Sequence, residues 1–174
     1  VFTQLSYMRR QSLGVKTDQI LVIKFPGPTE GMKTKMQSMR RAIKKLPLAS
    51  KVTCSGAVPG EEVAMFLSNH RAHDALKQNR LYEMLSCDPD YIDAYGLEVV
   101  AGRGFSEEYG DDVNKLVINE TAARMLGYVD NDDAIGEEIA VETLGEPMQV
   151  IGVVKDYHQQ ALNKGYTGVM LFHK

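Results

Sequence analysis

Apolar residues in the opening section of the chain follow two different patterns. Residues 18–25 contain four apolar residues in succession, a pattern typical of a strand buried on both faces, and residues 51–58 predict a second strand. The segment between them predicts a helix that Thr29 can cap and Pro47 ends. Its apolar residues repeat at steps of four and three, which places them on one helical face that we interpret as core: Met32, Met36, Met39, Ile43 and Leu46. The opening section is therefore predicted to be a β-α-β unit with parallel strands.

The first residues predict a short helix over 2–14, which Gly14 ends. No capping Ser, Asp or Asn precedes this helix. Two interpretations remain open: a frayed terminal helix, or the tail of a longer helix in which Arg9 and Arg10 suit a position close to a membrane.

The rest of the chain predicts a mixture of short strands and helices. Strands are predicted over residues 81–87, 97–105 and 115–118 and, as a hairpin turned at 144–147, over 138–141 and 148–154. A helical turn is predicted from Asp88 to Gly96, and a helix over 120–126 has Asn119 as its N-cap. Residues 61–80 are polar, and we expect an exposed insertion there.

The composition is that of an ordinary globular domain. Charged residues make up 25% of the chain, and the formal net charge of -3 is spread over both signs without a basic patch. Nucleic acid is therefore not expected as a partner. No apolar run reaches the roughly 20 residues that span a bilayer. The sequence could still belong to a larger membrane protein, and this alternative stays open.

The two cysteines, Cys54 and Cys87, are too few and too far apart in sequence for a zinc site or a disulfide framework. Because cysteine is usually buried, we favour two free thiols. A single disulfide stays open as the alternative.

Asp156 and His158 follow directly after the strand predicted to end at residue 154. The end of a strand is a common place for catalytic acids, bases and metal ligands. However, no nucleophile with a neighbouring base and no set of three ligands accompanies this pair in the sequence. We therefore interpret Asp156, Tyr157 and His158 as a structural turn at the strand end, in which Asp156 accepts hydrogen bonds and Tyr157 packs inward.

The remaining candidate metal and nucleotide motifs are incomplete. His70 and His73, beside Asp74, have the spacing of two ligands on one helical face but lack an evident third ligand. Gly102 and Gly104 are followed by Glu107 where a dinucleotide fingerprint requires glycine. Two acidic clusters lack the register of a calcium loop and are interpreted as solvated turns: Glu107, Glu108, Asp111 and Asp112, and Asp130, Asp132 and Asp133. No metal, nucleotide or other cofactor is expected.

Five segments, taken in their order along the chain, resemble a known family. They read SGAVPG, DPDYIDAYGLEVVAGRGFS, LVINETAARMLG, AIGEEI and VIGVVKDYHQQAL. This set resembles the MacB-like periplasmic core domain, the extracytoplasmic domain of FtsX/MacB-type ABC transporter permeases, in the version seen in Bacteroidetes-like permeases. The resemblance covers nearly the whole chain from about Leu13 onward.

The resemblance implies an α+β fold in three parts. These are a membrane-proximal helix remnant over 1–14, a porter-like β-α-β unit over 15–58 and a sabre-like mixed subdomain over 59–174. It implies a non-catalytic periplasmic domain of an inner-membrane permease, which reaches the membrane through flanking helices. The domain would couple motion of membrane helices, driven by a cytoplasmic ATPase subunit, to signalling, to extraction, or to export of cargo such as antimicrobial peptides or lipoproteins. A periplasmic adaptor or a substrate protein would be a further partner.

Members of the family usually continue into a second β-α-β unit, after the strand that residues 167–172 resemble. The sequence ends at Lys174, so we expect residues 18–25 and 51–58 to lack sheet neighbours and the chain to self-associate through them or through the methionine stripe. Two other functions stay open: a free-standing peptide-binding module, and a hydrolase or metal enzyme that uses Asp156 and His158.

Overall fold

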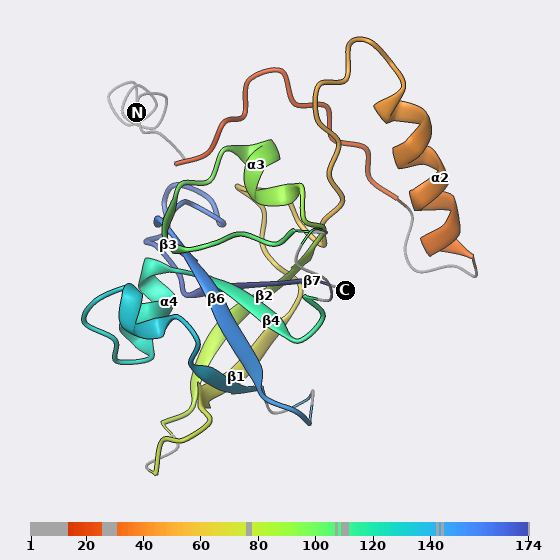
Figure 1. Ribbon diagram of the computed structural model, residues 1–174. Coiled ribbons are helices and arrows are strands. Elements are labelled where there is room, and N and C mark those ends of the chain that lie inside the picture. The colour runs from red at the N-terminus through yellow and green to blue at the C-terminus, as the bar shows by residue number, and fades with distance from the viewer. Residues whose placement is uncertain are drawn as a thin grey trace, which may run out of the picture.

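The computed structural model describes residues 14–25, 31–75, 78–106, 108, 112–141, 143 and 145–173. The helix predicted over 2–14 lies outside these residues except for Gly14, and so does the predicted cap Thr29. Within the described part, a seven-stranded sheet forms the body of the molecule (Figure 1). None of the described helices is long and apolar enough to cross a membrane.

The elements have the following bounds. The strands are β1 (Phe66–Arg71), β2 (Arg80–Cys87), β3 (Val99–Gly102), β4 (Lys115–Asn119), β5 (Glu138–Val141), β6 (Met148–Val154) and β7 (Val169–His173). The helices are α2 (Met32–Lys44), α3 (Tyr91–Tyr95), α4 (Glu120–Met125) and the 3-10 helix η2 (Asp132–Ala134). The predictions for β2, β4, the β5–β6 hairpin, α2, α3 and α4 are confirmed, and β3 forms the middle of the strand predicted over 97–105.

The sheet closes on itself through β5. The strand order is β3-β6-β4-β7-β2-β1-β5, and β5 pairs antiparallel both with β1 and with β6. Strands β6, β4, β7, β2, β1 and β5 therefore form a closed ring, which removes the exposed edges that an open sheet would present. β5 pairs with the start of β6, and β3 takes over the same edge of β6 from Gly152 to Val154.

Side chains alternate between the inside of the ring and its outer face, so the molecule has two cores. On β7, Met170 and Phe172 belong to the inner core, whereas Val169 and Leu171 belong to the outer one. The continuous apolar run of β7 follows from this burial on both faces. The inner core also contains residues of the other ring strands and of α4, among them Tyr82, Met84, Leu116, Ile118, Ala122, Ile139, Met148 and Val150. The outer core lies beneath α3 and contains Leu85, Cys87, Tyr91, Ile92, Tyr95, Val117, Ile151 and Tyr157.

Strand β3 pairs with β6 just beyond the residues of β6 that pair with β5. At this point the backbones of β3 and β6 approach each other closely. A Cβ atom on Gly152 would lie 2.0 Å from the carbonyl oxygen of Arg103, and one on Gly102 would lie 2.3 Å from that of Ile151. Both positions therefore exclude a side chain unless the backbone shifts. Arg103 N donates to Ile151 O at 2.9 Å, and this hydrogen bond holds the contact closed.

The predicted β-α-β unit at the start of the chain is wrong in its strands. Residues 20–25 are extended but belong to no strand, and residues 51–58 contribute only an isolated bridge between Ser55 and Cys87. A strand needs a neighbour for its N–H and C=O groups, and no described strand lies beside residues 20–25. The apolar residues of this segment are therefore exposed, and Leu21 shows 84% of its surface.

The helix α2 is correctly predicted, but its apolar stripe is not core. Met32, Met36, Met39 and Ile43 are half-buried, and Leu46 is exposed. Figure 1 shows α2 apart from the sheet, beyond the side of the molecule that carries α3. Helical periodicity identifies the face but not whether another element covers it.

The prediction of an exposed insertion over 61–80 is also wrong, because this segment contains β1. Asn69 of β1 is completely buried in the ring, where its amide Nδ2 lies 3.2 Å from the sulfur atoms of both Met84 and Met170. Strand β1 lies between β2 and β5, and its polar sequence gives no indication of this position in the sheet. His70 therefore lies on a strand and not on a helix with His73.

We expect Gly152→Ala to lower the free energy of unfolding by about 2 to 4 kcal/mol, because the new Cβ would collide with backbone atoms that cannot move independently. Urea unfolding measures this change. Gly165→Ala is the matched control, since a Cβ at Gly165 meets no atom within 4 Å. Equal stabilities of the two variants would contradict the close approach.

We expect the isolated domain to self-associate with rising concentration, because residues 20–25 expose a contiguous apolar surface. Leu21→Asp should shift the association to higher concentration in light scattering. Val129→Asp is the control, since Val129 is 90% exposed in a distant turn. A wild-type domain that stays monomeric at all concentrations would contradict this prediction.

Candidate functional site

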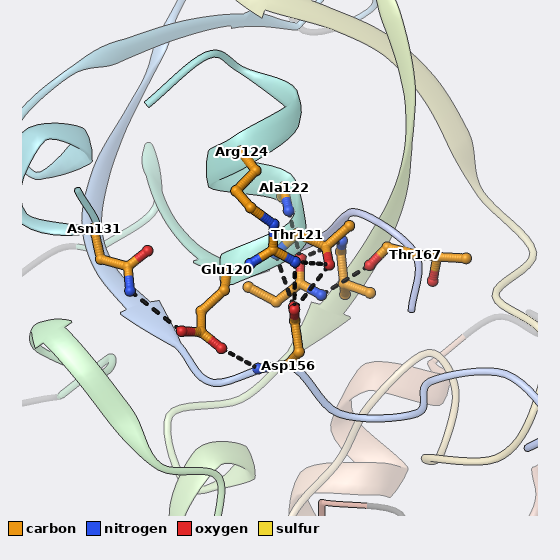
Figure 2. A network of polar contacts seen from close by, with 9 residues as sticks. Glu120, Thr121, Ala122, Arg124, Asn131, Asp156 and Thr167 are labelled. Carbon is orange, nitrogen blue, oxygen red and sulfur yellow. Dashed lines mark hydrogen bonds and ion pairs between the residues drawn. The ribbon is translucent and has the colours of Figure 1, made fainter. Parts of the chain in front are cut away.

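The carboxylate of Asp156, just past the end of β6, is the centre of a polar network (Figure 2). Its Oδ1 accepts a hydrogen bond from Thr121 N at 2.8 Å, and its Oδ2 accepts one from Thr121 Oγ1 at 2.9 Å. Arg124 Nη2 donates to the same Oδ2 at 2.7 Å. The side chain of Asp156 is only 10% exposed, so these donors replace the water that the carboxylate loses on burial.

Glu120 connects the same two segments in the opposite direction. Its Oε2 accepts a hydrogen bond from Asp156 N at 3.0 Å, and its Oε1 accepts one from Asn131 Nδ2 at 3.4 Å. The first turn of α4 and the end of β6 thus satisfy each other's backbone donors, as the sticks in Figure 2 show. We call Glu120, Thr121, Arg124 and Asp156 the Asp156 network.

Asn119 caps α4 and attaches it to β7. Its Oδ1 accepts hydrogen bonds from Ala122 N and Val169 N, both at 2.9 Å. Its Nδ2 donates to Thr167 O at 2.8 Å. Asn119 is buried, and this one side chain joins β4, α4 and the start of β7.

Tyr157 and His158 point to different surroundings from Asp156. Tyr157 is buried in the outer core with Tyr91, and burial raises the pKa of both phenols, so neither ionises near neutral pH. His158 is buried against Tyr166, with the ring centroids 4.5 Å apart. No hydrogen bond or ion pair joins Asp156 to His158 in the described part of the chain, so the structure does not bring together the pair that an enzyme would need.

The other sequence candidates also make structural contacts. Arg103 forms two hydrogen bonds to Asp112, with Nη2 to Oδ1 at 2.9 Å and Nη1 to Oδ2 at 3.1 Å, and these hydrogen bonds lower the pKa of Asp112. His73 Nε2 lies 3.4 Å from Glu138 Oε2 on the surface. Among the described residues, no three His, Cys, Asp or Glu side chains are placed to hold a metal ion.

Both cysteines are free thiols. Cys54 is half-buried, and Cys87 is buried in the outer core. The isolated β-bridge near the two cysteines pairs Cys87 with Ser55 and not with Cys54. Burial raises the pKa of the Cys87 thiol well above its ordinary value, so this thiol is unreactive.

The helix α2 is attached to the start of α3 by charged contacts. The sequence did not indicate these contacts. Arg40 contacts Asp88 and Asp90, and Lys44 Nζ lies 2.8 Å from Asp90 Oδ2. Asp88 also accepts a hydrogen bond from Cys54 N at 2.9 Å. Although burial would raise the pKa of Asp90, its hydrogen bonds to Lys44 and Arg40 hold it below the usual value. We call Arg40, Lys44, Asp88 and Asp90 the α2–α3 ion pairs; no sequence pattern links residues so far apart along the chain.

The family profile of the MacB-like periplasmic core domain matches residues 3–171, which is nearly the whole chain. The chain belongs to this family. No curated protein sequence matches it.

Three solved structures share the fold of this MacB-like domain. A domain of a putative permease protein from Porphyromonas gingivalis is 17% identical, with a TM-score of 0.52, and the match covers 77% of this chain and 55% of that one. The extracellular domain of the noncanonic ABC-type transporter YknZ from Gram-positive bacteria is 17% identical, with a TM-score of 0.55 and coverages of 79% and 61%. The periplasmic region of MacB from Actinobacillus actinomycetemcomitans is 16% identical, with a TM-score of 0.56 and coverages of 86% and 62%. The matched part of the domain therefore spans less than two thirds of each of these chains.

We expect Asp156→Ala to lower the free energy of unfolding by about 2 to 4 kcal/mol, because Thr121 N and Thr121 Oγ1 lose their acceptor and Arg124 loses its ion pair. Asp93→Ala is the matched control, since the side chain of Asp93 is 77% exposed and pairs with Lys51. Exposed pairs contribute about 0 to 1 kcal/mol, so the control should unfold nearly as the wild type does. Chemical denaturation compares the two, and an unchanged stability of Asp156→Ala would show that the network is not structural.

Proposed function

We propose that this MacB-like domain is a non-catalytic extracytoplasmic part of an ABC transporter permease that transmits the motion of membrane helices. The family match over residues 3–171 is the observation that carries the proposal. The three solved structures, from a putative permease, from YknZ and from MacB, agree with it at the level of the fold. The partners of the intact permease would be a cytoplasmic ATPase subunit and a periplasmic adaptor or substrate protein. The output would be export, extraction or signalling.

The contrast between the two kinds of contact supports a mechanical role. The ring and α4 are joined by the inner core and by buried polar contacts at Asn119 and in the Asp156 network. In contrast, α2 has no buried residue among those described and contacts the α3 turn through the α2–α3 ion pairs. The Lys44–Asp90 pair is exposed, and such pairs contribute little and rearrange easily, so a movement of α2 can reach the ring without unfolding it.

The proposal assigns a part to each section of the chain. Residues 1–14 would continue from a membrane helix, residues 15–58 would form the porter-like part that contains α2, and residues 59–174 would form the sabre-like part. On this division, the α2–α3 ion pairs lie at the joint between the second and third parts. The function as a peptide-binding module has no specific contact in its favour. An enzyme using Asp156 and His158 is disfavoured by the separate surroundings of the two side chains.

The test uses the intact permease reconstituted with its ATPase subunit. Arg40→Gln removes the cation shared by Asp88 and Asp90, and we expect the stimulated ATPase activity to fall about threefold or more because the joint transmits less motion. Arg41→Gln is the matched control, since Arg41 is the next residue of α2, is exposed and makes no side-chain hydrogen bond or ion pair within the described part.

Two measurements accompany the ATPase assay. The isolated Arg40→Gln domain should stay folded and lose about 1 to 2 kcal/mol in its free energy of unfolding, because the side chains of Arg40 and Asp88 are only 22% and 14% exposed. An intact permease that never co-purifies with an ATPase subunit would overturn the proposed function. Equal losses of activity in the Arg40 and Arg41 variants would overturn the role of the joint.

A further inference from the structure

A hollow with a volume of about 230 Å³ lies between the β1–β2 connection and the end of α4. Three arginines from three different elements line it: Arg71 at the end of β1, Arg80 at the start of β2 and Arg124 on α4. The other lining residues are Asp74, Gln78, Met125, Leu126 and Gly127. We call this hollow the arginine pocket. It is separate from the α2–α3 ion pairs, and it shares only Arg124 with the Asp156 network.

The three guanidinium groups are engaged to different degrees. Arg124 uses Nη2 for Thr121 and Asp156, and its Nε and Nη1 make no hydrogen bond or ion pair with a described residue. Arg71 lies over the ring of Tyr128, 4.7 Å from its centroid, and its Nη2 is 3.5 Å from Glu137 Oε2, which is at the outer limit of a hydrogen bond. Arg80 is exposed, and its side chain makes no hydrogen bond or ion pair with any described residue.

Arg71 and Arg124 each have contacts on one side that orient them before any ligand arrives. The ring of Tyr128 orients the Arg71 guanidinium, and Asp156 holds Arg124 from the side of Nη2. Arg80, which makes no ion pair with a described residue, gains a partner when an anion enters. Donors that other contacts already orient lower the ordering cost of binding.

We propose that the arginine pocket binds a phosphate group. Each guanidinium offers a planar fork of N–H donors that matches two oxygens of an oxyanion. A carboxylate has two oxygens and is satisfied by a single fork, whereas a phosphate has more oxygens and up to two charges and suits several arginines at once. The phosphate could belong to a free ion or to a lipid headgroup, and the recognition chemistry is the same.

Two features of the pocket oppose an anion. Asp74 lines it, and carboxylates already lie beside two of the arginines: Glu137 is 3.5 Å from Arg71 and Asp156 is 2.7 Å from Arg124, so Arg80 is the arginine without an ion pair to a described residue. The C-terminal end of α4 also faces the pocket, but a helix end carries at most about half an elementary charge, and α4 has only six residues. The inference does not depend on the proposed transport function.

The experiment titrates the domain with inorganic phosphate at constant ionic strength and follows the arginine Nε–H resonances by NMR. We expect saturable shifts of Arg71, Arg80 and Arg124, with a Kd on the order of 1 mM. Arg80→Gln should weaken binding by about fivefold or more, because it removes a charged donor. Arg41→Gln should change binding by less than about twofold, because that arginine is distant from the pocket and only alters the net charge.

A second arm distinguishes the source of the phosphate. Vesicles of phosphatidylcholine alone are compared with vesicles that also contain phosphatidic acid, again with the Arg80 and Arg41 variants. Binding to phosphatidic acid vesicles but not to the free ion, with loss in Arg80→Gln, assigns the pocket to a lipid headgroup, and saturable binding of the ion assigns it to a free phosphate. Absence of saturable binding in both arms overturns the inference, and so does equal weakening by the Arg80 and Arg41 variants.

Discussion

The pairing of β5 with both β1 and β6 is the constraint on which the rest of the structure depends. This strand of four residues closes the ring, and closure creates the interior in which Asn69 is completely buried, with its Nδ2 against the sulfur atoms of Met84 and Met170. Because β5 covers only the start of β6, the rest of that edge is open to β3. The backbone exchange there is possible because Gly102 and Gly152 carry no side chain.

The polar contacts at the end of β6 follow from the same closure. A helix of six residues, such as α4, is too short to be stable alone and forms because the ring supplies partners for its first turn. Asn119 and Asp156 each accept hydrogen bonds from backbone N–H groups of that turn, and Ala122 and Ala123 pack into the inner core. Asp156 thus attaches a short helix to the closed sheet, whereas His158 packs against Tyr166 and makes no hydrogen bond or ion pair with α4 among the described residues.

The helix α2 is attached by contacts of another kind. Its apolar face is half-buried, and charges at Arg40 and Lys44 hold it to the α3 turn. Exposed charge contacts are screened by salt, whereas the two cores of the ring are close-packed. The helix α2 and the ring of this MacB-like domain are thus held by different kinds of contact.

The sequence by itself determined the elements whose signals are local. Asn119 before an alanine-containing helix predicts the start of α4, and the hairpin over 138–154 is predicted by two apolar strands around a turn. The ordered set of short motifs identified the family, although it did not specify which segments pair. Tertiary structure alone decided that residues 20–25 are not a strand and that the polar segment around Asn69 is one, because a strand exists only where a neighbour meets its backbone groups. Tertiary structure also decided which distant side chains meet, as Arg40 meets Asp90 and as Arg71, Arg80 and Arg124 line one pocket. The order of charges along the chain does not specify which strands and helices pack together, so it could not predict these groups.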